Sequence, residues 1–390
     1  MSCHIASYAN RSYAALESEL GSVAAVTTAN RLPLSKLDIR SVRETSQRLD
    51  KSGGRTYVGA PQNGREHTAV QFHSYLTEWD SLSGMPQLHD VVQAAMGGEV
   101  QVNVANVIES VTNGQTLAMT APHGLSIGQA ISVGGEMRFV DSILDDHTVV
   151  VNCPVPAEVA NGTTVGRCVT YRLGSHLKSL TMLDYWDPST AIQRCAAGVS
   201  VDQVQVSVNG DFHEMAFQGE GSVYFDSATE LPLSTGLQEF PSEPLGEWST
   251  GELIPGSMGR AWIGTGGEAC TSVLVGKVTL NNHIDYRRRE FGGVRGGCVR
   301  AGMREVRLDL RIRAENSDDM RALFTSSRLQ QPIPVMFQLG EMSGRMCALY
   351  MPQVVMEVPV FDDSGPSLEW IIRQARAQGV FNDELIVAFG

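Results

Sequence analysis

The chain has 390 residues, a formal net charge of −13 and 42% hydrophobic residues. This length and apolar content suffice for two or three folded domains with sizeable cores. A chain this acidic lacks the broadly basic surface that binds nucleic-acid phosphates, which argues against general nucleic-acid binding. No apolar run approaches the roughly 20 residues of a membrane helix. The N-terminus also lacks a signal-peptide pattern, so we expect synthesis in a reducing cytoplasm.

The seven cysteines are scattered, and none forms a Cys-x-x-Cys pair. This spacing predicts buried, unpaired thiols rather than a disulfide framework or a zinc site. The nine histidines show no His-Glu-x-x-His motif. We therefore expect no metal and no cofactor.

Residues 1–31 are predicted to form an N-terminal arm, in which Tyr13, Leu16 and Leu20 are spaced to share one side of a short helix. Apolar and polar residues then alternate over 34–48, which predicts a strand with one buried face.

A polar, glycine-rich loop is predicted at Asp50–Glu66, and the alternating stretch Thr68–Glu78 is expected to return as a second strand. A short helix is predicted at Met85–Ala95. The two strands and their long loop would form an extended hairpin.

Between residues 99 and 168, short apolar runs alternate with turn signals such as Asn113-Gly114, Gly134-Gly135 and Asn161-Gly162. Turn signals spaced by about 10 residues are typical of small all-β modules. We therefore expect an inserted small β-barrel or immunoglobulin-like module. Residues 226–264 are rich in Pro, Ser and Glu and are predicted to be an extended linker.

The plan of the first half recurs in the second. A strand-like run at Val273–Glu290 precedes the glycine-rich loop Phe291–Gly302, and the returning strand Arg304–Ala314 follows. In this strand, apolar residues alternate with charged ones over Val306–Arg313, which predicts one buried face. Ser317 can then cap a short helix, and Ile333–Phe337 forms the next apolar run.

By this plan we align Leu37–Glu78 with Val278–Glu315, and Val199–Phe217 with Met351–Ile372. The sequence thus predicts a mainly β protein with two tandem β-sandwich or split-barrel domains, each with a short helix. The predicted divisions are an arm (1–31), a discontinuous first domain (32–98 and 169–225), the inserted module (99–168), a linker (226–264) and a second domain (265–390).

Charge is distributed unevenly along the chain. Cys195–Gly259 holds ten acidic residues and no Lys or Arg, whereas Tyr286–Arg313 holds nine arginines and three acids. The two zones are either solvated surfaces or complementary faces that meet between subunits. On the second alternative, the candidate inter-subunit contacts are Arg287, Arg288, Arg289, Arg295, Arg300, Glu239, Glu243 and Glu247.

Two motifs resemble functional sites, but the sequence around them does not predict the structure that such sites need. Ser126 lies in a Gly-x-Ser-x-Gly pattern, but a strand and turn are predicted after it instead of the required helix. Tyr185 and Trp186 could form a sugar-binding aromatic patch, although packing beneath the sheet is favoured because such side chains usually bury most of their area. No residue is assigned a catalytic role.

Several stretches resemble a phage tail tube protein. They are the run His176–Asp187 (HLKSLTMLDYWD), the alternating strand Cys195–Gly210, the Gly-rich exit Phe217–Gly221 and the short helix Leu88–Gly98. The resemblance covers roughly residues 32–98, 169–225 and 265–390 and is one of pattern.

The resemblance implies a structural virion protein of a long-tailed phage, without catalysis. In this family, sheets of neighbouring domains join into a β-barrel around a lumen, and a long hairpin loop reaches the next ring. Two fused domains would allow three chains to form a pseudo-sixfold ring. The implied partners are other copies of the chain, other tail proteins and DNA that passes through an acidic lumen without specific binding, with no membrane involved.

The implied location is the tail of a virion assembled in the host cytoplasm. Two alternatives stay open. The chain could be a distal-tail or hub component with the same fold, or a carbohydrate-binding β-protein that uses residues 99–168 with Tyr185 and Trp186.

Overall fold

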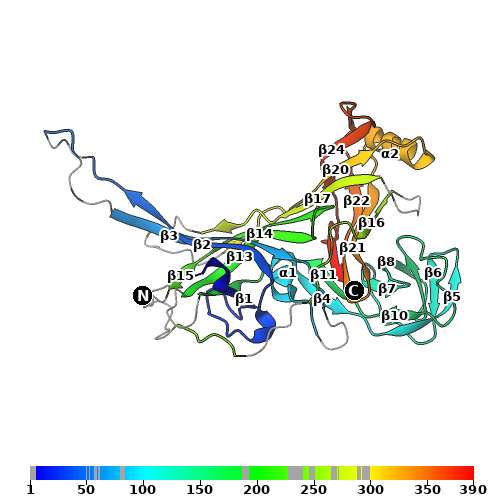
Figure 1. Cartoon of the computed structure of the whole chain (residues 1–390), viewed down its shortest axis with the longest axis horizontal. Coiled ribbons are helices and arrows are strands. Elements are labelled where there is room, and N and C mark those ends of the chain that lie inside the picture. The colour runs from blue at the N-terminus through cyan, green and yellow to red at the C-terminus, as the bar shows by residue number, and fades with distance from the viewer. Residues whose placement is uncertain are drawn as a thin grey trace.

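The computed structural model describes residues 6–49, 51, 53–56, 59, 62–79, 84–186, 193–226, 240–245, 251–264, 270, 272–287, 291 and 299–390. The protein is mainly β, with a large antiparallel sheet system and a small closed barrel, which confirms the predicted fold class. A long hairpin projects from one end of the molecule, and the barrel lies at the other end (Figure 1).

Eight strands form one continuous antiparallel sheet, the long sheet, which spans both halves of the chain. In spatial order its strands are β2 (Leu34–Ser46), β3 (Gln62–Tyr75), β14 (Glu214–Gly221), β13 (Gln193–Val208), β17 (Val273–Asn281), β20 (Glu305–Arg313), β24 (Glu369–Ala377) and β23 (Val360–Asp362).

The alternation predicted for the second half produces β20. Val306, Leu308, Leu310 and Ile312 are each at most 2% exposed. Successive side chains of a strand point to opposite faces, so the polar residues between them lie on the other face of the sheet.

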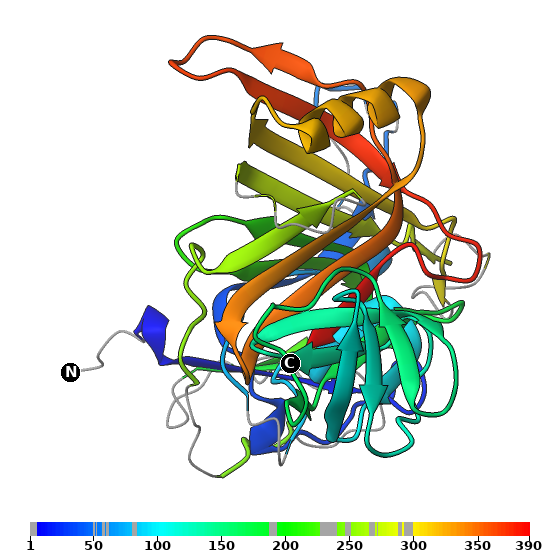
Figure 2. The same ribbon diagram turned by 90° about the vertical axis from the view of Figure 1, so that its right-hand side faces the viewer.

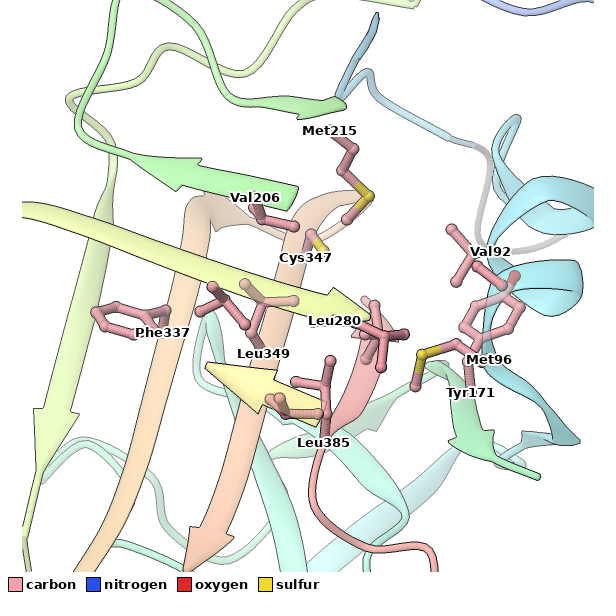
Figure 3. Packing of buried hydrophobic residues seen from close by; sticks show 14 of the residues in the cluster. Val92, Met96, Tyr171, Val206, Met215, Leu280, Phe337, Cys347, Leu349 and Leu385 are labelled. Carbon is pink, nitrogen blue, oxygen red and sulfur yellow. The ribbon is translucent and has the colours of Figure 1, made fainter. Parts of the chain in front are cut away.

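Six strands form a second antiparallel layer. In spatial order they are β4 (Gly97–Val102), β11 (Val169–Leu173), β25 (Ile386–Phe389), β22 (Arg345–Val355), β21 (Ile333–Met342) and β16 (Gly259–Ile263). The main hydrophobic core lies between this layer, the long sheet and helix α1 (His89–Met96). Side chains from all three meet in Figure 3, including Val206, Leu349 and Met96.

The sequence explains where α2 begins and where α1 ends. Ser317 accepts a hydrogen bond from the Met320 amide and caps α2 (Asp318–Leu329), as predicted. Gly97 closes α1 in the left-handed region, with φ of 71°, where glycine carries no steric penalty. A Cβ atom at Gly97 would approach the carbonyl oxygen of His176 to 2.7 Å.

The residues predicted as an N-terminal helix instead form strand β1 (Asn10–Leu16), which pairs with β12 (Leu180–Trp186). The helix prediction was wrong. The spacing of Tyr13 and Leu16 fits a helix, but pairing with a distant strand determines the structure of this segment. A further strand, β15 (Val223–Asp226), pairs with the first half of β13. Short 3-10 turns occupy Ser7–Ala9 and Thr28–Asn30.

The loops are shorter than predicted. β3 begins at Gln62, inside the expected loop Asp50–Glu66. The run expected at Val273–Glu290 breaks after β17 into β18 (Asp285–Tyr286), which pairs with β19 (Val299–Arg300). The predicted linker contains β16, which pairs with β21.

The inserted module is a closed six-stranded barrel. Its strands are β5 (Asn106–Thr112), β6 (Thr116–Met119), β7 (Ala130–Val133), β8 (Glu136–Ile143), β9 (Thr148–Val151) and β10 (Thr164–Gly166). Figure 2 shows the barrel in front of the long β21–β22 hairpin. An apolar cluster joins the barrel to that hairpin, and within it Phe139 stacks on Tyr350 with ring centroids 4.9 Å apart.

A buried charge network reinforces this contact. Glu136 of the barrel pairs with Arg138 and with Arg260 of β16. The Arg138 side chain is 2% exposed and donates to the carbonyl oxygens of Met137 and Pro154. Burial lowers the pKa of Arg138, so its charge depends on this carboxylate and these carbonyls.

Substituting Glu136→Gln should therefore destabilise the chain by about 3 kcal/mol, because it leaves the Arg138 charge buried without its counter-ion. The shift in thermal or denaturant midpoint measures this effect. Glu158→Gln, on the exposed surface of the same barrel, is the matched control and should change stability little. Equal midpoints for the two variants would contradict the structural role of Glu136.

Candidate functional site: the two edges of the long sheet

The two halves of the chain are joined in the long sheet by one strand pairing, β13 with β17. Six residue pairs make this junction, from Gln203 opposite Asn281 to Val208 opposite Gly276. At its centre Val206 faces Val278, and both side chains are at most 3% exposed. The junction is thus a paired continuation of one sheet, with one of its faces buried.

On each side of the junction the same four-strand unit occurs. The first unit is β2-β3-β14-β13, and the second is β17-β20-β24-β23. In each unit the second strand in chain order, β3 or β20, precedes a helix. It lies between the first strand of the unit and a strand of the unit's last hairpin, β14 or β24. The repeat proposed from the sequence thus has a counterpart in strand order.

Two details fix the correspondence between the units residue by residue. The first strand of each hairpin has a register shift near its start, at Leu34/Lys36 and at Val273/Val275. The closing hairpins also have loops of equal length. Ser207 pairs with Glu214, and Asp362 pairs with Glu369, each pair being seven positions apart. On this correspondence Phe361 occupies the place of Val206, and Ile39 the place of Val278.

Each unit has one strand that lacks its junction partner. Among the described residues, β2 pairs only with β3, and β23 pairs only with β24. By the correspondence above, these are the strands equivalent to the two that meet in the junction. Unpaired backbone groups along a strand edge template pairing with another strand. Over the three residues of β23, the two edges therefore offer the same kind of pairing as β13 with β17. On β2, the Ile39 carbonyl accepts from the Arg194 guanidinium of the same chain at 3.2 Å.

The β23 edge also exposes apolar side chains. Val358, Val360 and Phe361 are 48%, 62% and 55% exposed. Phe361 lies on an aromatic cluster with Phe324 of α2 and Trp370 of β24, with centroids 6.0 and 5.9 Å away. The equivalent Val206 is 3% exposed and lies in the main hydrophobic core, whereas Phe361 lies at a free edge of the sheet.

The exposed face of the long sheet is mixed in charge rather than acidic. Arg307 pairs with Glu305 at 2.7 Å, and Arg311 pairs with Asp362 at 3.3 Å and with Glu369. The bonded Arg307 side chain is the main cause of the lowered pKa of Glu305.

To one side of these charges, amide side chains at register-adjacent positions form an uncharged row across four strands. They are Gln71, Gln218, Gln203 and Asn281.

The predicted contact residues are only partly placed. Arg287 and Arg300 are described and exposed. Glu243 pairs with Arg11 of the same chain and accepts from the Tyr13 hydroxyl at 3.1 Å, so within the chain it already has partners. The remaining candidates lie outside the described residues: Arg288, Arg289, Arg295, Glu239 and Glu247. Phe361 and Ile39 were not among the contact residues predicted from the sequence.

The catalytic and sugar-binding candidates lack a supporting geometry. Ser126 is followed by a turn and then by strand β7 rather than by a helix. Tyr185 is 1% exposed, and the Trp186 indole donates to Asp184 at 3.0 Å. In the described part of the chain, no group of three His, Cys, Asp or Glu residues is placed to hold a metal ion. No helix there is long and apolar enough to span a bilayer.

Comparison of the sequence with known protein families and with curated proteins finds no match in either.

A buried histidine anchors the β13–β14 turn at one end of the junction. His213 is 1% exposed, and its Nε2–H donates to the carbonyl oxygen of Met258 at 2.7 Å. Burial lowers the pKa of His213, since the charged form is poorly solvated there. The unfolded chain therefore binds a proton more readily than the folded chain does.

The contribution of neutral His213 to stability should be complete above the unfolded histidine pKa of about 6.5. It should fall as the pH drops through that value, by at most about 1.4 kcal/mol per pH unit. Thermal unfolding of wild type and His213→Gln between pH 7.5 and 5.5 measures this. The variant should lose less stability on acidification than wild type does. Parallel pH profiles for the two proteins would contradict the assignment.

Proposed function

We propose that the chain is a structural virion protein that polymerises into the tail tube of a long-tailed phage, with the free edges of the long sheet as its assembly surface. The observation that carries this proposal is the internal junction. It joins β13, at the edge of the first unit, to β17, at the edge of the second. The equivalent strands β23 and β2 form the two outer edges of the long sheet. A second chain can repeat that pairing without any new kind of contact.

A head-to-tail contact of this kind gives a ring if the rotation between units closes. Three chains with two units each make a ring of six units and a barrel of about 24 strands. Barrels of 16 to 18 strands already enclose an aqueous channel, so a barrel of this size leaves a wide lumen. This agrees with the resemblance to tail tube proteins noted in the sequence.

The exposed face of the long sheet is the face that would line the lumen, because its other face is buried in the core. DNA would then meet arginines that carboxylates of the same sheet already engage, such as Arg307 and Arg311, together with the row of amides. Paired cations offer phosphates little net attraction. The proposed lumen thus lets DNA pass without specific binding, by charge balance instead of the acidic surface that we first expected.

The basic loop at Arg287 and Arg300, facing the acidic segment of another subunit, stays a prediction for contacts between chains. So does the contact of the β2–β3 hairpin with the next ring. The strand-edge contact is proposed as the main one because it satisfies backbone hydrogen-bonding groups at two sheet edges.

The proposal predicts which residues meet between chains. At the junction Gln205 lies opposite Thr279, and the equivalent positions at the free edges are Val360 and Arg40. Opposed residues of antiparallel strands have Cα atoms about 4.5–5.5 Å apart, within the range of a disulfide. The double variant Val360→Cys with Arg40→Cys should therefore form intermolecular disulfides on oxidation, giving covalent species up to three chains on a non-reducing gel.

The matched control is Gln205→Cys with Thr279→Cys, which should oxidise within one chain and migrate as a monomer. Wild type reports any background from the native cysteines. If the control oxidises fully while the Val360/Arg40 variant stays monomeric under assembly conditions, the proposed edge pairing is wrong.

A further inference from the structure

Three exposed apolar residues lie at the end of the long sheet from which the β2–β3 hairpin projects. Met303 precedes β20, and Val380 and Phe381 follow β24, with exposed fractions of 91%, 74% and 86%. The two segments lie together because Val306 of β20 pairs with Ala377 of β24. We call Met303, Val380 and Phe381 the apolar tip.

The tip is held in a fixed shape. Asp383 accepts hydrogen bonds from the amides of Val380 and Phe381, at 2.9 and 3.1 Å. Arg304 pairs with Glu384 at 3.2 Å and ties the turn to the start of β20. Large apolar side chains on an ordered, exposed turn mark an interaction surface, and the ordering lowers the entropy lost on binding.

A groove opens at the opposite end of the same strands. Its cavity volume is about 520 Å³, and it lies where β13 ends at Val208 and β17 begins at Val273. The end of β17 at Asn281 pairs with Glu305, beside the tip, so β17 runs from the groove toward the tip. The apolar part of the groove lining is Val208, Met258, Ala261, Cys270, Val273 and Leu339.

We propose that the apolar tip of one copy inserts into this groove of a second copy, and that this contact stacks one ring on the next. The inference rests on the proposed ring, whose closure uses the edges of the sheet and leaves its two ends free. An apolar protrusion and an apolar-lined groove at opposite ends of one chain make a heterologous contact that does not close and therefore propagates. A second copy of this chain is thus the occupant that the molecule itself supplies.

Two variants test the two halves of the contact separately. Phe381→Ser with Val380→Ser removes the tip and leaves the groove. Ser257→Trp, at an exposed groove-lining position, blocks the groove and leaves the tip. The control Leu144→Ser replaces a side chain of the barrel that is 61% exposed. Electron microscopy and sedimentation give the number of rings per stack.

Each variant alone should shorten the mean stack at least tenfold, to single rings, whereas Leu144→Ser should stack as wild type does. An equimolar mixture of the tip and groove variants should form stacks of two rings and no longer ones, because each such pair retains one intact tip and one intact groove.

Variants that stack to wild-type length, or a mixture that yields only single rings, overturn the inference. Wild-type chains that associate end to end without closing rings would contradict the proposed function and retain the tip-groove contact. Wild-type chains that form no assembly at all would overturn both.

Discussion

The pairing of β13 with β17 is the interaction on which the architecture depends. Backbone N–H and C=O groups at a sheet edge need partners, and this junction supplies them by joining two equivalent units in six residue pairs. The same operation leaves β2 and β23 as the outer strands of the chain. The internal junction pairs one edge of each unit and leaves the other edge of each unit without a neighbouring strand. These two outer edges are the physical basis of the proposed assembly.

The two units differ where their surroundings differ. Helix α1 packs against β1, β4, β11, β12 and β13, and five of its eight residues are buried, whereas α2 buries only Met320, Leu323 and Ser327. The barrel is inserted between β4 and β11, which follow α1, whereas β21 and β22, which follow α2, are joined by a short turn. The Glu136 network ties the barrel to β16, and the Phe139–Tyr350 stack ties it to β22, so the insertion packs against strands of the second half of the chain.

Local patterns predicted much of this fold, and long-range pairing accounts for what they missed. The alternation over Val306–Ile312 identified β20, because one face of that strand is buried, and Ser317 marked the start of α2. The spacing of Tyr13 and Leu16 suggested a helix, yet that segment pairs with β12, more than 160 positions away. The free edge at β23 spans three residues, too few for a periodic signal, and its meaning appears only beside the junction that it matches.

The central claim is that the free edges repeat the internal junction until a ring closes. Native mass spectrometry of the smallest stable assembly, combined with the symmetry of its averaged end-on view in the electron microscope, tests this claim most directly. The account predicts particles of three chains with six similar lobes around a central channel. A stable monomer under all assembly conditions, or a closed dimer without a channel, would contradict it.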